Sequence, residues 1–78
     1  MDIRKRVWPS AEEMPGHPPE IWRKDHVGNS MNFQEYLNPA CNHGWEIVYV
    51  KPIEAGGADE IANMRAQNLR VNYPNLDN

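Results

Sequence analysis

Three histidines and the single cysteine are the side chains of this chain best suited to hold a transition metal: His17, His26, Cys41 and His43. Imidazole and thiolate groups are the usual ligands of zinc, and four of them can complete a tetrahedral site. The spacing does not fit the known zinc patterns, because the chain has no CxxC pair. We therefore expect loop histidines, an idle thiol and no metal, and keep a zinc site as an alternative.

Acidic side chains are the second group with chemical potential. Those of interest are Glu46, Glu54, Asp59 and Glu60. They could contact a basic partner or imitate a row of phosphates, and scattered surface acids would look the same. Residues 25–78 carry seven acidic and three basic side chains, a net charge of −4. Nucleic-acid binders usually present a basic surface, so this balance favours a basic protein surface as partner over DNA.

The N-terminus carries the only basic run, Arg4-Lys5-Arg6, with Trp8 close behind it. Such a cluster could form a nucleic-acid-binding arm with a stacking aromatic ring. The simpler interpretation, which we favour, is a frayed and solvated end. Four of the seven prolines lie within residues 9–19, and proline interrupts regular structure. We therefore predict an irregular arm over residues 1–17, with at most one helical turn from Ser10 to Met14, capped by Ser10.

The elements that must position these side chains are short. β-branched and aromatic residues predict a strand from Trp45 to Lys51, with Trp45, Ile47 and Tyr49 on one face and Glu46 and Val48 on the other. We also predict a hairpin around Gly28-Asn29, a strand at 64–68, helical turns at 33–37, 58–64 and 69–73, and a core built on Trp22, Tyr36 and Trp45. The fold class is α+β.

Size and composition limit the class of protein. A chain of 78 residues forms one small domain, and a core of that size often needs a metal, a disulfide or a partner. Its lone cysteine cannot form an internal disulfide, and its longest apolar run, Ile47 to Val50, is too short to span a membrane. With no apolar stretch behind the basic run, we expect no secretory signal and a cytoplasmic location. A homodimer would help stability.

Most of the chain, over roughly residues 18–75, resembles the HNH endonucleases. One small HNH branch reads GWEIDHI-x-P-x-x-x-GG-x-D-x-x-x-NL, and the matching segments here are Gly44-Trp45-Glu46-Ile47, Lys51-Pro52-Ile53, Gly56-Gly57-Ala58-Asp59 and Ile61-Ala62-Asn63-Met64. Upstream, Ile21-Trp22-Arg23-Lys24-Asp25 is similar to the W-R-x-D segment of that branch, and Gly28 and Tyr36 also match. The resemblance implies a ββα-metal fold, with an HNH-like domain over residues 18–78.

The chain departs from the family at the residues that carry the chemistry. The resemblance puts the metal-ligating Asp at Val48 and the general-base His at Tyr49. Valine has no lone pair, and a phenol with a pKa near 10 is a poor base at neutral pH. The central Asn, which braces the loop in the family, is retained as Asn63, and the last ligand position is Asn72. We therefore expect no enzyme activity, no cofactor and no metal.

The resemblance implies a non-catalytic HNH-like binding protein of a phage or mobile element. We expect an anti-CRISPR inhibitor that docks on a basic surface of a CRISPR effector complex in the bacterial cytoplasm. The contact residues we expect are Tyr49, as an exposed aromatic anchor, and the acids Glu46, Glu54, Asp59 and Glu60. Two alternatives are an inactive HNH-derived DNA-binding protein, and a metal-dependent HNH nuclease in which Glu46 replaces a ligand.

Overall fold

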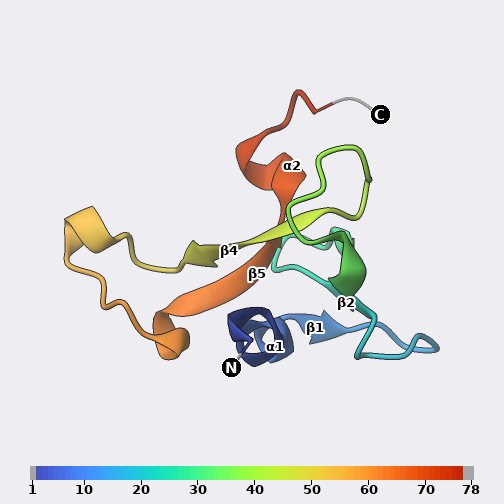
Figure 1. The fold of residues 1–78 in the computed structure, drawn as a ribbon, viewed down its shortest axis with the longest axis horizontal. Coiled ribbons are helices and arrows are strands. Elements are labelled where there is room, and N and C mark those ends of the chain that lie inside the picture. Colours follow the sequence, from blue (N-terminus) through green and yellow to red (C-terminus); the bar gives the residue numbers. More distant parts are fainter. Residues whose placement is uncertain (1, 77–78) are drawn as a thin grey trace.

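A computed structural model describes residues 2–76 of the chain. It is a mixed α+β structure of short elements joined by long turns (Figure 1). The helices and strands are α1 (Ile3–Val7), β1 (Glu12–Glu13), β2 (Trp22–Lys24), β3 (Ser30–Asn32), β4 (Trp45–Tyr49), β5 (Met64–Asn68) and α2 (Leu69–Asn72). Four 3-10 turns lie at Trp8–Ser10, Phe33–Glu35, Ile53–Ala55 and Ile61–Asn63. In this part of the chain, no helix has the length and apolar character needed to cross a membrane.

The strands form two small antiparallel sheets. β1, β2 and β3 lie in that order, and the predicted hairpin is confirmed, with Trp22 opposite Asn32 and Gly28 in the left-handed region at φ 98°. The second sheet pairs β4 with β5 from Trp45 opposite Asn68 to Tyr49 opposite Met64. The predicted strand at 64–68 is therefore confirmed, and α2 follows it directly.

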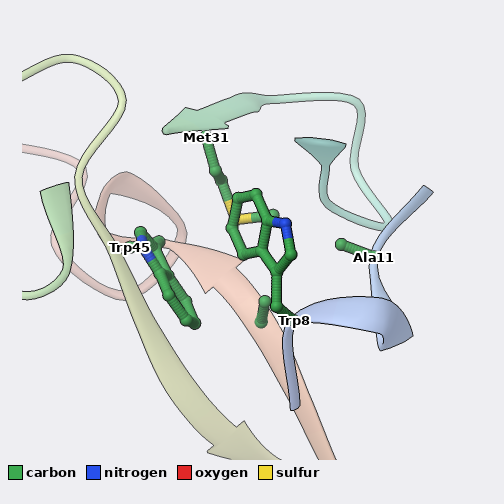
Figure 2. Packing of buried hydrophobic residues seen from close by; sticks show 5 residues of the cluster. Trp8, Ala11, Met31 and Trp45 are labelled. Carbon is green, nitrogen blue, oxygen red and sulfur yellow. The ribbon is translucent and has the colours of Figure 1, made fainter. Parts of the chain in front are cut away.

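The core is built on aromatic rings that pack tilted or edge-on against one another, with Trp8 and Trp45 at its centre (Figure 2). Trp45 is completely buried, and its ring centroid lies 4.9 Å from that of Trp8. Met31 and Ala66 close the cluster from β3 and β5. The predicted burial of Trp45 is confirmed. Trp22 and Tyr36 are half-buried, with Tyr36 packed edge-on against Trp45.

The N-terminal residues are not an irregular arm, and the prediction of a frayed end is wrong. The carboxylate of Asp2 accepts a hydrogen bond from the Arg4 amide and caps α1. Val7 and Trp8 are buried, and the indole N–H of Trp8 donates to the Pro19 carbonyl at 2.8 Å. The first turn of a helix tolerates proline. Pro9 therefore fits the 3-10 turn that carries Trp8 into the core. Trp8 therefore cannot be an exposed stacking ring.

The predicted helical turn from Ser10 to Met14 is also wrong. Residues 12–13 form strand β1, which pairs with β2 opposite Lys24 and Arg23. Ser10 caps no helix; its hydroxyl accepts a hydrogen bond from the Ala66 amide at 3.1 Å. The N-terminal segment is thus tied to β5 and shares one core with the rest of the described chain.

Candidate functional site

The β4–β5 hairpin and α2 carry the expected site positions Glu46, Val48, Tyr49 and Asn72. Paired residues of an antiparallel sheet share a face, so Val48 lies beside Arg65 and Glu46 beside Gln67. Glu46 and Val48 therefore share one face of β4, as predicted. Tyr49 lies on the opposite face with Met64.

Glu46 and Asn72 form the link between β4 and α2 on this face. The Asn72 amide donates a hydrogen bond to the Glu46 carboxylate at 3.0 Å. Burial raises the pKa of Glu46, and the hydrogen bond from Asn72 opposes that rise. The structure thus brings Glu46 and Asn72 together. The hydrogen bond between them occupies one donor of the Asn72 amide and one acceptor of the Glu46 carboxylate.

Tyr49 occupies the position of the expected base without the properties of one. Its hydroxyl donates a hydrogen bond to the Asp59 carboxylate at 2.7 Å. This bond raises the pKa of Tyr49 above its ordinary value, because it stabilises the protonated phenol. The side chain is 38% exposed, in agreement with the predicted surface position. A protonated phenol that already donates its proton cannot accept one from water.

Asn63 fixes the long connection between β4 and β5. Its side-chain oxygen accepts from the Lys51 amide at 2.9 Å, and its side-chain nitrogen donates to the carbonyls of Lys51 and Ala58 at 2.9 and 2.8 Å. We call this connection, residues 50–63, the tip. Gly57 is needed in it, since a Cβ there would lie 1.9 Å from the Lys51 carbonyl oxygen. Asn63 therefore braces the base of the tip through Lys51 and Ala58.

The tip projects from the body of the molecule and carries apolar and acidic side chains (Figure 1). Val50 and Ile53 are 54% and 44% exposed, and Glu54, Asp59 and Glu60 are exposed as well. The ion pairs of the described residues join Arg4 to Asp2, Arg23 to Glu13 and Lys24 to Glu12. All three lie within residues 2–24, so no ion pair in the described chain neutralises the tip acids.

The expected metal-binding residues do not assemble. Within residues 2–76, no three His, Cys, Asp or Glu side chains are grouped to hold a metal ion. His43 Nδ1 shares a hydrogen bond with the Ser30 hydroxyl at 2.9 Å, and Cys41 Sγ accepts from the His43 amide. The zinc alternative is therefore contradicted. The divalent ion of an HNH site does not fit either, because Val48 offers no ligand and Asn72 is bonded to Glu46.

A buried polar network joins Asp25 to Asn68, and it was not predicted from the sequence. The two side chains are only 4% and 2% exposed. Asp25 accepts from the backbone amides of Val27, Asn29 and Asn68, while Asn68 caps α2 by accepting from the Arg70 amide. Asp25 belongs to the W-R-x-D similarity, which is the signal that could have identified it. Its role is to fasten the β2–β3 turn to β5.

The titration of Glu46 gives a prediction for stability. Glu46 ordinarily titrates near 4.5, and its raised pKa means that the folded state binds the proton more readily. The contribution of Glu46 to the free energy of unfolding is therefore fully present below pH 4.5. It is lost as the pH rises through the pKa of Glu46 in the folded state. Glu46→Gln keeps an acceptor for Asn72 and removes the charge. We expect it to be at least as stable as wild type at pH 7, with the difference shrinking near pH ~4.

Urea unfolding at both pH values measures this effect. Glu54→Gln is the matched control, since it removes the same charge from an exposed side chain of the tip. A Glu46→Gln variant less stable than wild type at pH 7 would contradict the assigned sign.

Comparison with known proteins gives no relative: no protein-family model, no curated protein and no solved structure matches this chain.

Proposed function

We propose that this chain is a non-catalytic binding protein built on an HNH-like ββα unit, formed by β4, β5 and α2. In this proposal it acts as an anti-CRISPR inhibitor of a phage or mobile element, and the tip docks on a basic surface of a CRISPR effector complex. The observation that carries the proposal is the contrast between two neighbouring regions. Val48 and Tyr49 offer no metal ligand and no base, while the adjacent tip is braced by Asn63, exposed and acidic.

The structure of the tip supports a role in binding. Ordering a flexible loop costs free energy on association, and a loop already fixed by Asn63 avoids much of that cost. Val50 and Ile53 offer apolar area for a partner, with Tyr49 beside them. The unneutralised carboxylates of Glu54 and Glu60 attract a surface rich in Lys and Arg and raise the association rate.

The test is capture of purified CRISPR effector complexes by the full chain, together with phage plating on a CRISPR-bearing host. We expect a complex with at least one effector and a rise in plating efficiency when the chain is expressed. No complex and no rescue of the phage would reject the inhibitor role. A plasmid-nicking assay with Mg²⁺, Mn²⁺ or Ni²⁺ should show no cutting, and metal-dependent cutting would favour the nuclease alternative.

The proposed kinship with HNH sites gives a second prediction. Val48→Asp combined with Tyr49→His places a carboxylate on the face of Glu46 and Asn72 and an imidazole beside it. We expect the double variant to bind Mn²⁺ or Ni²⁺ with a Kd of about 0.1 mM or tighter, where wild type shows no binding.

Isothermal titration calorimetry measures this gain. The matched control, Val50→Asp with Lys51→His, introduces the same two groups two residues further along, inside the tip. Equal affinity in both variants would mean that the Val48 and Tyr49 positions have no special geometry and would count against the HNH relation.

A second candidate function is binding of single-stranded nucleic acid without cleavage. Lys5 and Arg6 on α1 are exposed and make no ion pair in the described chain. Lys5 also borders a pocket of about 300 Å³ that includes Phe33 and Arg23. Affinity for an oligonucleotide that falls steeply with salt, and is lost in Lys5→Glu, would favour this function.

A further inference from the structure

The two strands of the β4–β5 hairpin differ at their outer edges. In an antiparallel pair, facing residues alternate between exchanging hydrogen bonds and turning their backbone groups outward. On β5, the outward amide of Ala66 donates to the Ser10 hydroxyl at 3.1 Å. The outward amide of Asn68 donates to the Asp25 carboxylate at 3.0 Å. The N-terminal half of the chain lies along β5 and thus closes its outer edge (Figure 1).

The outer edge of β4 has no such cover beyond its first residue. The register pairs Trp45 with Asn68 and Ile47 with Ala66. Because the Asn68 and Ala66 amides face outward, the backbone groups of Trp45 and Ile47 face outward as well, followed two residues later by those of Tyr49. Within residues 2–76, no hydrogen bond reaches the outward amide or carbonyl of Ile47 or of Tyr49. We call this stretch, residues 47–49, the open edge.

The start of the same edge shows how an extended backbone covers it. Tyr36 forms an isolated parallel bridge with Trp45, and the Leu37 amide donates to the Trp45 carbonyl at 2.8 Å. Leu37 itself has φ 57°, in the left-handed region, which ends the extended run after this single bridge. The chain therefore pairs with β4 at Trp45 and leaves the open edge uncovered. An uncovered strand edge is a template for an added strand.

We propose that the open edge binds an extended segment of a partner protein that carries Lys or Arg side chains. An extended backbone offers donors and acceptors at the two-residue spacing of Ile47 and Tyr49, as strand addition requires. The surrounding side chains select the charge, since Glu46 lies on β4 and Asp59 is hydrogen-bonded to Tyr49 at 2.7 Å. Arg65, the cation of this sheet, stands on β5, one strand further from the edge.

A second copy of the chain is a poorer occupant than a basic segment. Its own open edge would bring a second Glu46 carboxylate to the same joint, and like charges across paired strands are destabilising. The net charge of −3 on each copy opposes their approach, while a basic segment is attracted. The inference rests on the proposed function for the presence of a basic partner. It adds how the backbone of that partner is held beside the tip.

An NMR titration of the full chain with a synthetic peptide tests the proposal without any effector complex. The peptide is blocked at both ends and alternates lysine and valine over about seven residues, in about 50 mM salt. We expect a Kd on the order of 0.1–1 mM, the affinity of a short interface. The amide signals of Ile47 and Tyr49 should shift, while those of Ala66 and Asn68, already bonded within the chain, should stay in place.

The matched control peptide has the same sequence with N-methyl groups on its central backbone amides, which removes their donors and keeps every charge. We expect it to bind at least ~10-fold more weakly. Equal affinity of the two peptides would mean that charge alone holds them and would overturn the proposal. So would amide shifts of Ile47 and Tyr49 that grow with protein concentration in the absence of peptide, because a second copy would then occupy the edge.

A pair of variants tests the edge from the side of the protein. Tyr49→Pro removes the outward N–H, a change that a strand edge tolerates because that N–H is not part of the β4–β5 ladder. Tyr49→Ala loses the same hydrogen bond to Asp59 and keeps the backbone donor. We expect Tyr49→Pro to bind the lysine–valine peptide at least ~5-fold more weakly than Tyr49→Ala does. Equal affinities in two folded variants would overturn the proposal.

The peptide also separates this inference from the proposed function. Peptide binding at Ile47 and Tyr49 without capture of an effector complex would support the open edge and reject the inhibitor role. Capture of an effector complex without peptide binding would keep the tip as the contact surface and overturn the open edge as a binding site.

Discussion

Asp25→Ala is expected to lower the free energy of unfolding by about 3 kcal/mol or more. The Asp25 carboxylate is 4% exposed and accepts backbone N–H bonds from Val27, Asn29 and Asn68 at 2.9–3.0 Å. The Asn68 amide is buried, and leaving such a donor without a partner costs about 1–3 kcal/mol. The loss of the two turn bonds adds to this, because hydrogen bonds to a charged group are the strong ones. A domain of this size has a total stability on the order of 4–12 kcal/mol. The variant should therefore lose a large part of it.

Urea unfolding followed by tryptophan fluorescence measures this loss, since Trp8 and Trp45 report on the core. Glu54→Ala is the control, because it removes an exposed carboxylate and should change stability by less than about 0.5 kcal/mol. Asp25→Asn should fall between the two, since it keeps one of the two acceptor oxygens. Wild-type stability in Asp25→Ala would mean that this network adds nothing to the fold.

The parts of the fold that could be predicted are those specified by neighbouring residues. β-branched and aromatic residues indicate β4, the strand at 64–68 is confirmed to the residue, and Gly28-Asn29 marks the hairpin turn. Strands that are close in the sequence pair according to the turn between them and to the residues at which each strand ends. These signals are present in the sequence itself.

The N-terminal segment could not be predicted because its structure depends on distant contacts. Trp8 is buried against Trp45, and Ser10 accepts from the Ala66 amide, 56 residues away. The prolines around them indicate an irregular segment when considered locally. Burial of a tryptophan ring outweighs that local preference.

In the candidate site, too, features set by neighbouring residues could be predicted, while contacts between distant segments could not. Residue types alone predict that Val48 and Tyr49 cannot perform the chemistry of an HNH site, and alternation along the strand predicts that Glu46 shares a face with Val48. The Glu46–Asn72 and Tyr49–Asp59 hydrogen bonds could not be predicted, since they depend on where α2 and the tip lie relative to β4. Those bonds tie β4 to α2 and to the tip.

Glu54→Lys is expected to reduce the rate of association with the proposed effector complex about 10-fold at low salt. The tip carries three acids and one basic residue, Lys51, so reversing one charge removes most of its negative potential. Charge pairs at an interface mainly steer the encounter, and salt screens them. Surface plasmon resonance at about 50 and 500 mM salt should show the difference shrinking at the higher concentration.

The matched control for this change is Glu20→Lys. Glu20 is exposed, lies outside the tip, and its reversal alters the net charge of the chain by the same amount. If the tip makes the contact, Glu20→Lys should slow association by less than about threefold, as expected for a remote charge. Equal rates for the two variants would mean that net charge alone governs binding and would exclude the tip as the contact surface.

Ile53→Asp separates contact from steering at the same surface. Ile53 is 44% exposed on the tip, and burying a new carboxylate against a partner costs more than the apolar contact it replaces. We expect the dissociation rate to rise at least ~10-fold, and this effect should persist at high salt because it does not depend on long-range charge. Val27→Asp makes the same substitution at an exposed apolar residue away from the tip and should leave dissociation unchanged. An unchanged dissociation rate in Ile53→Asp would exclude insertion of the tip into the partner.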